Sequence, residues 1–269
     1  MKLPETDIVL EIIQKSSNSI LEIYEDEKLF NIVDFKSDHS PLTLADKRSH
    51  GIIVEALLNY FPDIPVLSEE GMCMPYEIRK NWEYFWLVDP LDGTKEFLKR
   101  NGEFTVNIAL IKNSYPEMGF IHIPVKNVTY YSTPAEGVIK VENGNRVELK
   151  DRGNRKDLVA VRSKSHSSPE EEGFYNKLGI KSFISVGSAI KFCMVAEGKA
   201  DLYYRHGPTM EWDTAAGQAI VGRAEGSIIS LDSAERLTYN KRDLSNGPFI
   251  CLGLIRDLNK LKNWGLIKT

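Results

Sequence analysis

The sequence predicts a layered α/β fold, in which sheets and helices pack on one another in alternation. The prediction depends on helix-like periodicity in the first third, short strand-like runs in the middle, and alternating strand-like and helix-like segments beyond residue 157. With 269 residues, of which 42 % are hydrophobic and 27 % charged, the chain has the composition of a soluble globular protein. A chain of this length can bury a large core.

Two stretches of the first third have apolar residues every three or four positions, which predicts two helices. Thr43 is a candidate N-cap for the second helix, with Asp46 three residues later in a near capping-box pattern. Pro62 and Pro65 end this helix. The periodic residues are Ile8, Ile12 and Ile13 in the first stretch, and Ile52, Ile53, Ala56, Leu57 and Tyr60 in the second.

Short apolar runs separated by turn sequences follow, and they predict an antiparallel meander of strands. The first run stops at Asp89-Pro90. The runs are residues 84–88, 105–111, 119–125, 128–132 and 138–141.

The polar stretch from Asn143 to Asp157 has no apolar period and is the predicted boundary between two halves, residues 1–155 and 156–269. Beyond it, strand-like and helix-like segments alternate, as expected for a layered architecture. The predicted strands are 158–162, 183–186, 201–204, 228–230 and 249–255, and the predicted helices are 188–197 and a segment after Asp213.

The charge balance argues against a nucleic-acid polymer or an anionic membrane as the partner. Lys and Arg number 34 and Asp and Glu 38, so 34 − 38 gives a net charge of −4, and no basic run is evident. No secretory signal follows Met1 and no stretch is long enough to span a membrane, so we expect a cytoplasmic protein, with peripheral inner-membrane association left open. Cys73, Cys193 and Cys251 are widely spaced and predict neither a disulfide nor a zinc site.

Two carboxylates follow a buried-looking strand in the segment Trp86 to Thr94. Asp89 and Asp92 are three residues apart, with a stiffening proline between them and the permissive Gly93 after them. Two fixed acids at a strand end are costly unless a cation lies between them, and hard oxygen ligands of this kind suit Mg²⁺. The alternative is an ordinary solvated turn.

Two further acidic segments favour the metal-binding interpretation. Glu69 and Glu70 also follow a short apolar run, and Asp213 precedes a helix of small residues, at an N-cap position. Taken singly, the first pair is typical of an exposed acidic loop and Asp213 of a plain helix cap. Three such motifs in one chain are harder to explain in that way.

In this order, these segments resemble the signature motifs of the inositol monophosphatase superfamily of metal-dependent, lithium-sensitive phosphatases. Other segments resemble its 3'(2'),5'-bisphosphate nucleotidases of the bacterial CysQ type, although Lys164 stands where those enzymes commonly have Arg, and Tyr204 where Pro is frequent. The superfamily motifs are Thr43 to Asp46, Ser68 to Glu70, Leu87 to Thr94 and Glu211 to Gly217. The nucleotidase-like segments are Lys95-Glu96-Phe97, Asn101 to Ala109, Ser163 to His166 and Gly187 to Phe192.

The resemblance covers nearly the whole chain and implies a layered α-β-α-β-α sandwich whose two halves form one catalytic unit. It implies two Mg²⁺ ions, with a third, weaker one near Asp46 and Glu69. Asp46 and Thr94 are implied to orient and deprotonate the attacking water; taken alone, Asp46 is also what a helix places in its first turn. The implied metal ligands are Glu69, Asp89, Asp92, Asp213 and the carbonyl oxygen of Leu91.

The implied reaction is removal of the 3'-phosphate from 3'-phosphoadenosine 5'-phosphate, a by-product of sulfate assimilation, to give AMP. The alternatives are an inositol monophosphatase, a fructose-1,6-bisphosphatase, or a non-catalytic metal- or nucleotide-binding regulator. The partner is therefore a small nucleotide bisphosphate, and the protein is expected to be a monomer or a homodimer. The implied substrate-binding residues are Gly93, Thr94, Ser163, His166, Gly187, Ser188, Lys191 and Arg205.

Overall fold

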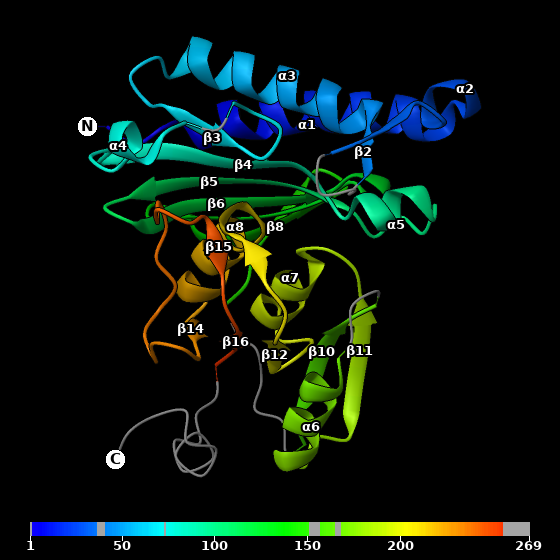
Figure 1. Ribbon diagram of the computed structural model, residues 1–269, viewed down its shortest axis with the longest axis vertical. Coiled ribbons are helices and arrows are strands. Elements are labelled where there is room, and N and C mark those ends of the chain that lie inside the picture. Colours follow the sequence, from blue (N-terminus) through cyan, green and yellow to red (C-terminus); the bar gives the residue numbers. More distant parts are fainter. Residues whose placement is uncertain (1, 37–40, 73, 151–156, 165–167, 255–269) are drawn as a thin grey trace.

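Helical and sheet layers alternate in the order α-β-α-β-α in the computed structural model, which describes residues 2–36, 41–72, 74–150, 157–164 and 168–254 (Figure 1). Two helices that pack on each other, α1 (Thr6–Glu25) and α3 (Leu44–Tyr60), form the outermost layer and cover one face of the larger sheet. The α/β fold class and both early helices are therefore confirmed. Between these helices lie α2 (Glu27–Phe30), β1 (Val33–Phe35) and β2 (Pro41–Thr43).

The second layer is a seven-stranded sheet with the order β3-β4-β5-β6-β7-β8-β9. The strand β3 is parallel to β4, and each later strand pairs antiparallel with the one before it, which confirms the predicted meander. Two short helices, α4 (Tyr76–Arg79) and α5 (Thr94–Leu98), lie on either side of β4 in sequence. The strands are β3 (Val66–Ser68), β4 (Tyr84–Asp92), β5 (Thr105–Lys112), β6 (Tyr115–Ile123), β7 (Val128–Thr133), β8 (Gly137–Glu142) and β9 (Asn145–Glu148).

The central layer contains α7 (Ile190–Ala196) and α8 (Glu211–Arg223), which pack between the two sheets (Figure 1). The small residues of α8 permit very close packing: a Cβ added to Gly119 of β6 would lie 2.5 Å from the carbonyl oxygen of Ala216. On the other side of α8, a Cβ at Gly217 would lie 2.4 Å from the ring of Phe192 in α7. The helix is therefore fixed on two sides by contacts that leave no space for larger residues.

The fourth layer is a five-stranded sheet with the order β11-β10-β12-β16-β14, and α6 (Pro169–Lys177) covers its outer face. A two-stranded ribbon, β13 with β15, lies beside the start of α8. The second half contributes β10 (Val159–Ser163), β11 (Ser182–Val186), β12 (Leu202–Arg205), β13 (Thr209–Met210), β14 (Ser227–Ser230), β15 (Ser245–Asn246) and β16 (Phe249–Leu252).

Several element boundaries differ from the sequence prediction, and four of these differences matter for the fold or the site. β4 continues past Asp89 to Asp92, where pairing with β5 resumes after an irregularity. β6 ends at Ile123 because Pro124 has no N–H for the ladder, and the chain turns there into a 3₁₀ segment, η1 (Pro124–Lys126). The exposed strand β9 lies inside the polar stretch that was predicted to be a boundary.

The fourth difference is the start of α8, and it corrects the predicted N-cap position of Asp213. The N-cap is Met210, and Asp213 is the third residue of the helix. Its carboxylate accepts a hydrogen bond from the backbone N–H of Met210 at 2.8 Å, which is how an acid at this position closes a helix start. By contrast, Thr43 caps α3 as predicted, together with Asp46.

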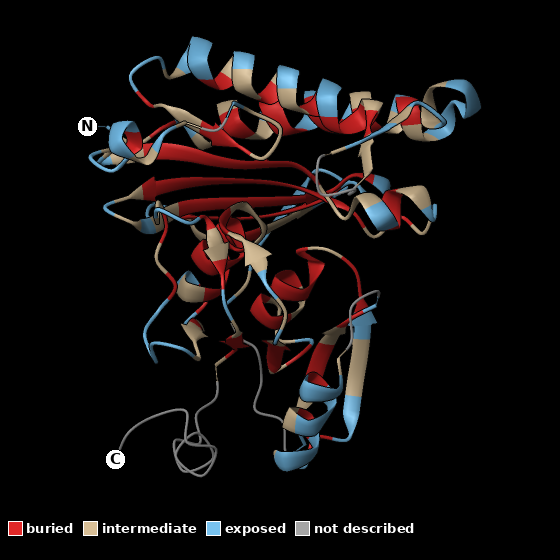
Figure 2. Ribbon diagram, in the orientation of Figure 1, coloured by how far each residue is buried: buried red, intermediate tan, exposed pale blue. Residues whose placement is uncertain are grey.

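Hydrophobic cores fill the spaces between the layers, and Figure 2 shows that the central strands of the larger sheet are buried throughout. The thiols of Cys193 and Cys251 are buried and form no disulfide, while Cys73 lies outside the described residues. In the part of the chain that the structure describes, no helix combines the length and hydropathy needed to cross a bilayer.

One buried histidine predicts a pH-dependent stability. His122 of β6 is 1 % exposed and hydrogen-bonds Thr129 and Ser17, and burial lowers its pKa to about 4. The unfolded chain binds this proton near pH 6.5, so stability falls as the pH drops from 6.5 towards 4. We expect this residue to account for about 2 kcal/mol of the stability lost between pH 7 and pH 5.

The measurement is urea unfolding of the wild type and a His122→Asn variant at pH 7 and pH 5. The variant is less stable at pH 7, but it should lose less stability on acidification because it cannot take up the proton. An identical loss in both proteins would contradict the assignment.

Candidate active site

The parallel pairing of β3 and β4 brings the first two acidic motifs to one edge of the larger sheet. Ser68 lies opposite Val88, and the N–H of Glu69 donates to the carbonyl oxygen of Val88 at 3.1 Å. Parallel neighbours end at the same edge, so Glu69 leaves β3 beside Asp89 of β4. This pairing explains why motifs twenty residues apart in the sequence contribute to one site.

Asp89 is the most buried of these carboxylates, with 1 % of its surface exposed. Its Oδ1 accepts a hydrogen bond from the N–H of Leu91 at 3.1 Å. Burial raises the pKa of Asp89 well above its usual value, and the negative charges of Glu69 and Asp92 raise it further. The pKa of Asp213 is also raised, first by burial and then by the charge of Asp92.

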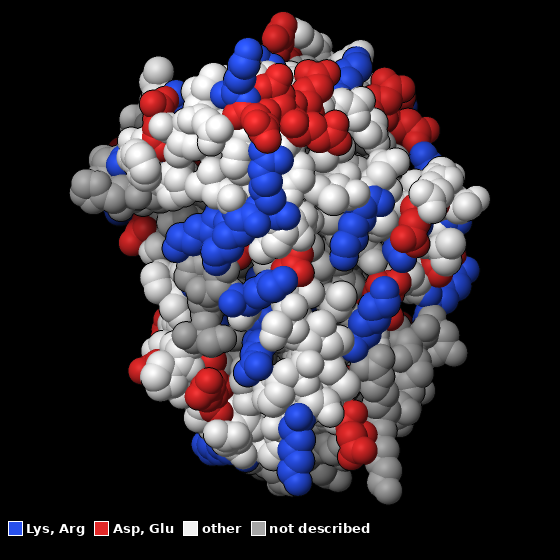
Figure 3. Space-filling view, turned by 90° about the vertical axis from the view of Figure 1, so that its right-hand side faces the viewer, with Lys and Arg blue, Asp and Glu red and all other residues white. Residues whose placement is uncertain are grey.

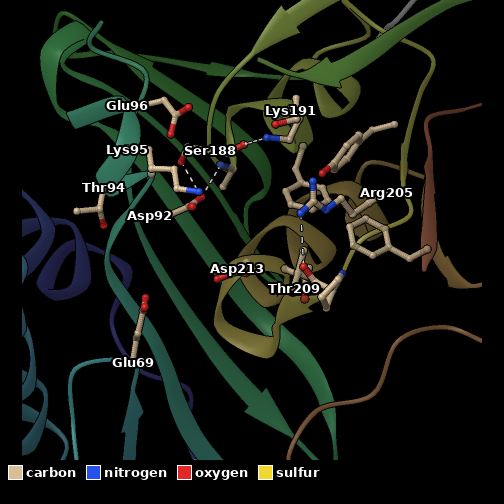
Figure 4. A pocket seen from close by; sticks show the side chains of 18 of the residues that line it. Glu69, Asp92, Thr94, Lys95, Glu96, Ser188, Lys191, Arg205, Thr209 and Asp213 are labelled. Carbon is tan, nitrogen blue, oxygen red and sulfur yellow. Dashed lines mark hydrogen bonds between the residues drawn. The ribbon is translucent and has the colours of Figure 1, made fainter. Parts of the chain in front are cut away.

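Asp92 connects the larger sheet to the central layer. Its Oδ2 accepts hydrogen bonds from the hydroxyl of Ser188 and the N–H of Ala189, both at 2.6 Å (Figure 4). Ser188 has a positive φ of 54°, which is uncommon for a residue with a side chain, and the residue lies directly before Ala189, the N-cap of α7. The end of β4 and the start of α7 are thus joined at this carboxylate.

Asp46 and Thr94, the predicted water-activating pair, are brought together. The hydroxyl of Thr94 donates to Asp46 Oδ1 at 3.3 Å, although the two residues are 48 positions apart. The other carboxylate oxygen accepts the N–H of Thr43 at 2.7 Å. Burial raises the pKa of Asp46 to about 6, against the lowering effect of Thr43 and with a further rise from Glu70 and Glu69.

Lys36 is a member of the site that the sequence analysis missed. Its ammonium group lies 2.7 Å from Glu69 Oε1 and 2.6 Å from Glu70 Oε1. These carboxylates raise the pKa of Lys36 despite its burial, so the lysine is charged. It follows an exposed strand with no motif of its own, and the excess of carboxylates was the one signal that a cation should be near.

The donor set fits Mg²⁺. Several partly or fully buried carboxylates raise one another's pKa, so a divalent cation between them would be favourable, and carboxylate oxygens are its preferred ligands. In the described part of the chain, no three of these carboxylates already lie close enough together to hold a metal ion. Lys36 binds Glu69, and Ser188 and Ala189 bind Asp92.

A pocket of about 340 Å³ adjoins these carboxylates, and its opposite side is basic. Figure 4 shows Lys191 and Arg205 on the side of the pocket away from Glu69. The ammonium group of Lys191 donates to the carbonyl oxygen of Ser188 at 2.6 Å and lies over the ring of Tyr203. Burial lowers the pKa of Lys191, and the charge of Asp92 opposes this effect.

Most of the predicted site residues line this pocket, but four do not. Asp46 does not line the pocket but is hydrogen-bonded to Thr94, which does. Asp89 and Leu91 are buried in β4. Gly187 is packed against Glu103, whose carboxylate accepts its N–H at 2.9 Å. His166 lies outside the described residues. The predicted residues that line the pocket are Glu69, Asp92, Gly93, Thr94, Ser163, Ser188, Lys191, Arg205 and Asp213.

Several lining residues were not among the predicted ones. Three of them are aromatic: Phe192, Tyr203 and Phe249. Phe192 ends the nucleotidase-like segment Gly187 to Phe192, whereas the sequence positions of Tyr203 and Phe249 indicate only a hydrophobic core. Figure 3 shows a compact acidic cluster with a band of Lys and Arg directly below it on one face of the molecule, so this face is not uniformly basic.

Comparison with known proteins agrees with this geometry. Residues 3–260 match the model of the inositol monophosphatase family. The chain belongs to this family. It is 44 % identical over 243 residues to the 3'(2'),5'-bisphosphate nucleotidase CysQ of Escherichia coli K12. The aligned region covers 90 % of this chain and 96 % of the relative. The resemblance found in the sequence is therefore confirmed.

Solved structures of family members show the same fold. The crystal structure of CysQ from Bacteroides thetaiotaomicron has a TM-score of 0.80 and 45 % identity, covering 93 % of this chain and 97 % of that one. A structure of an IMPase/NADP phosphatase complexed with Mg²⁺ and phosphate has a TM-score of 0.76 at 18 % identity. The match covers 96 % of this chain and 93 % of that one. The second likeness concerns the fold alone.

Proposed function

We propose that this family member is a Mg²⁺-dependent 3'(2'),5'-bisphosphate nucleotidase that hydrolyses 3'-phosphoadenosine 5'-phosphate to AMP and inorganic phosphate. The observation that carries the proposal is the pocket with two oppositely charged sides. Glu69, Asp92 and Asp213 lie on one side, where Lys36 is bound to Glu69 and Lys95 lies beside Asp92, and Lys191 and Arg205 lie on the other. A substrate with two separate phosphates fits this arrangement, because one phosphate reacts at the metal-binding side and the other meets the basic side chains.

The names of the relatives support the same substrate class. The E. coli and B. thetaiotaomicron relatives, at 44 % and 45 % identity, are both CysQ proteins, and the former is named as a 3'(2'),5'-bisphosphate nucleotidase. An inositol monophosphate carries a single phosphate, so it has no second phosphate that could meet Lys191 and Arg205. We therefore prefer the nucleotide bisphosphate to the inositol phosphate.

In this proposal, Glu69, Asp89, Asp92, Asp213 and the carbonyl oxygen of Leu91 hold the Mg²⁺ ions. Bound Mg²⁺ supplies neutralisation of the phosphate charge and stabilisation of the attacking and leaving oxygens. Gly93 and Thr94 line the pocket, and we assign their backbone N–H groups to the phosphate oxygens. Ser163 and Ser188 line the same pocket and are assigned to the ribose or its second phosphate.

Proton transfer is assigned to Asp46 and Thr94. Thr94 orients the attacking water through its hydroxyl and passes the proton towards Asp46, with which it is hydrogen-bonded. A carboxylate with a pKa of about 6 can accept a proton near neutral pH, which a threonine hydroxyl alone cannot do. The water oxygen bonds to phosphorus, the bond from phosphorus to the ribose 3'-oxygen breaks, and that oxygen takes up a proton.

The test is phosphate release from four compounds at equal concentration, with Mg²⁺ and with a chelator. They are 3'-phosphoadenosine 5'-phosphate, adenosine 3'-monophosphate, inositol 1-phosphate and fructose 1,6-bisphosphate. We expect Mg²⁺-dependent release, fastest from the first. Adenosine 3'-monophosphate has the reacting phosphate but not the second one, so its kcat/KM should be lower by about tenfold or more, the weight of one lost charge-assisted contact.

Each other outcome identifies the part of the proposal that fails. Equal kcat/KM for the two adenosine compounds would remove the role of Lys191 and Arg205. Preference for inositol 1-phosphate or fructose 1,6-bisphosphate would keep the acidic site and reject the nucleotide substrate. Release that continues in chelator would reject the metal-binding role of the carboxylates.

A further inference from the structure

A second carboxylate near Asp213 is completely buried and has no place in the proposed chemistry. Glu211 is the first residue of α8, two positions before Asp213, and none of its surface is exposed. It accepts hydrogen bonds from the N–H of Asn240 at 2.7 Å and of Lys241 at 3.0 Å, and from the ammonium group of Lys241 at 2.7 Å. A buried charge of this kind is retained only when it is fully paired.

Asn240 and Lys241 belong to the loop 238–246, and this loop also holds the residues on both sides of Asp213. The ammonium group of Lys241 also donates to Asn246 Oδ1 at 3.0 Å. The amide nitrogen of Asn246 in turn donates to the carbonyl oxygen of Met210 and to the hydroxyl of Thr214, both at 3.1 Å. Hydrogen bonds thus fix the start of α8 at three places: at its first residue, Glu211, at Met210 before it, and at Thr214 after Asp213.

A further connection leads from this loop to the segment that follows Glu69. Arg79 of α4 is 2 % exposed and donates to Asn240 Oδ1 at 2.7 Å. The amide nitrogen of Asn240 returns a hydrogen bond to the carbonyl oxygen of Arg79 at 2.6 Å. The loop 238–246 therefore contacts both the first turn of α8, which supplies Asp213, and α4, which comes after Glu69 in the sequence.

The loop itself contributes no residue to the pocket lining among the described residues. Its effect on the site must therefore pass through the segments that it holds. The carboxylates of Asp92 and Glu69 repel that of Asp213, and the first turn of a helix has N–H groups without partners inside the helix. Without an anchor, rotation or fraying of this turn is the simplest way to relieve the repulsion.

We propose that Glu211 is a positioning residue: with Lys241 it fixes the first turn of α8 so that Asp213 faces the other carboxylates, and it thereby sets the affinity for Mg²⁺. This inference rests on the metal-binding role of Asp213 in the proposed function. It assigns no contact between Glu211 and the metal or the substrate. Outer partners of metal ligands typically change metal affinity by about 10- to 100-fold when removed.

The test is isothermal titration of the metal-free, full-length protein with MgCl₂ alone. Glu211→Gln keeps the shape but weakens the ion pair, and we expect the Kd for Mg²⁺ to rise by about tenfold or more. At saturating Mg²⁺ most of kcat should return, because Asp213 itself is intact. The matched control is Glu197→Gln, which weakens a partly buried carboxylate far from Asp213 in the sequence that binds Tyr130, Lys140 and Lys199. The control is expected to lower the melting temperature and leave the Kd within about twofold.

A second variant covers the case in which Glu211→Gln does not fold. Lys241→Met removes an ammonium group that is part of the same clamp, but its side chain is 34 % exposed and less critical to the core. A Kd that rises by about threefold or more supports the proposal, and a Kd within about twofold of wild type in either folded variant overturns it. If the wild type itself binds no Mg²⁺, the proposed function fails instead, so the two failures are distinguishable.

Discussion

Replacing Asp89 by Asn is expected to abolish activity while making the metal-free protein more stable. The substitution removes a proposed Mg²⁺ ligand, and we expect kcat to fall by about three orders of magnitude or more, a loss of about 4 kcal/mol in transition-state stabilisation. In chelator the melting temperature should rise, because Asp89 is buried among like charges that raise its pKa. The amide keeps the oxygen that accepts the N–H of Leu91.

The measurements are phosphate release at saturating substrate and thermal unfolding with EDTA and with Mg²⁺. Mg²⁺ should stabilise the wild type more than the variant, because binding to the folded state alone raises its stability. Asp201→Asn is the matched control: this aspartate accepts the N–H of Val159 in the five-stranded sheet and lies outside the pocket lining. Activity within tenfold of wild type in Asp89→Asn would reject its role as a ligand.

Asp46→Asn should lower kcat by about 10²- to 10⁴-fold with little change in the affinity for Mg²⁺. The amide cannot accept the proton of the attacking water, but it can still cap α3 by accepting the N–H of Thr43. Single-turnover phosphate release at saturating Mg²⁺ isolates this chemical step from product release.

Thr94 provides the matched pair for that experiment. Thr94→Ser keeps the hydroxyl that donates to Asp46 and is expected to retain most activity, whereas Thr94→Val removes it and should resemble Asp46→Asn. The double variant Asp46→Asn/Thr94→Val should be little worse than either single variant, because the two residues act as a unit. Fully additive losses would show that they act separately.

The strongly periodic parts of the fold were predictable because burial on one face imposes a pattern on the sequence. α1 and α3 bury apolar side chains at helical spacing, whereas the central strands of the larger sheet are buried on both faces and were predicted from continuous apolar runs. β9 was missed because all four of its residues are exposed, so only pairing with β8 makes it a strand. The start of α8 was misplaced because Asp213 closes the helix from its third position.

The proposed acidic ligands were predictable for a different reason: each lies near the end of a strand or in the first turn of a helix, and such motifs are local in sequence. The partners that hold them are not local. Lys36 reaches Glu69 across 33 positions, and Asn240 reaches Arg79 across 161. Their residue types carry no periodicity and no motif, so only the folded chain reveals them.

The close packing of α8 between β6 and α7 also limits how this sequence can change over evolution. Any enlargement at Gly119 or Gly217 would push the helix sideways, and Asp213 would move with it. The proposed metal ligand Asp213 is therefore tied to close packing in the central layer, and so is the pocket wall at Phe192, whose ring meets the Gly217 position.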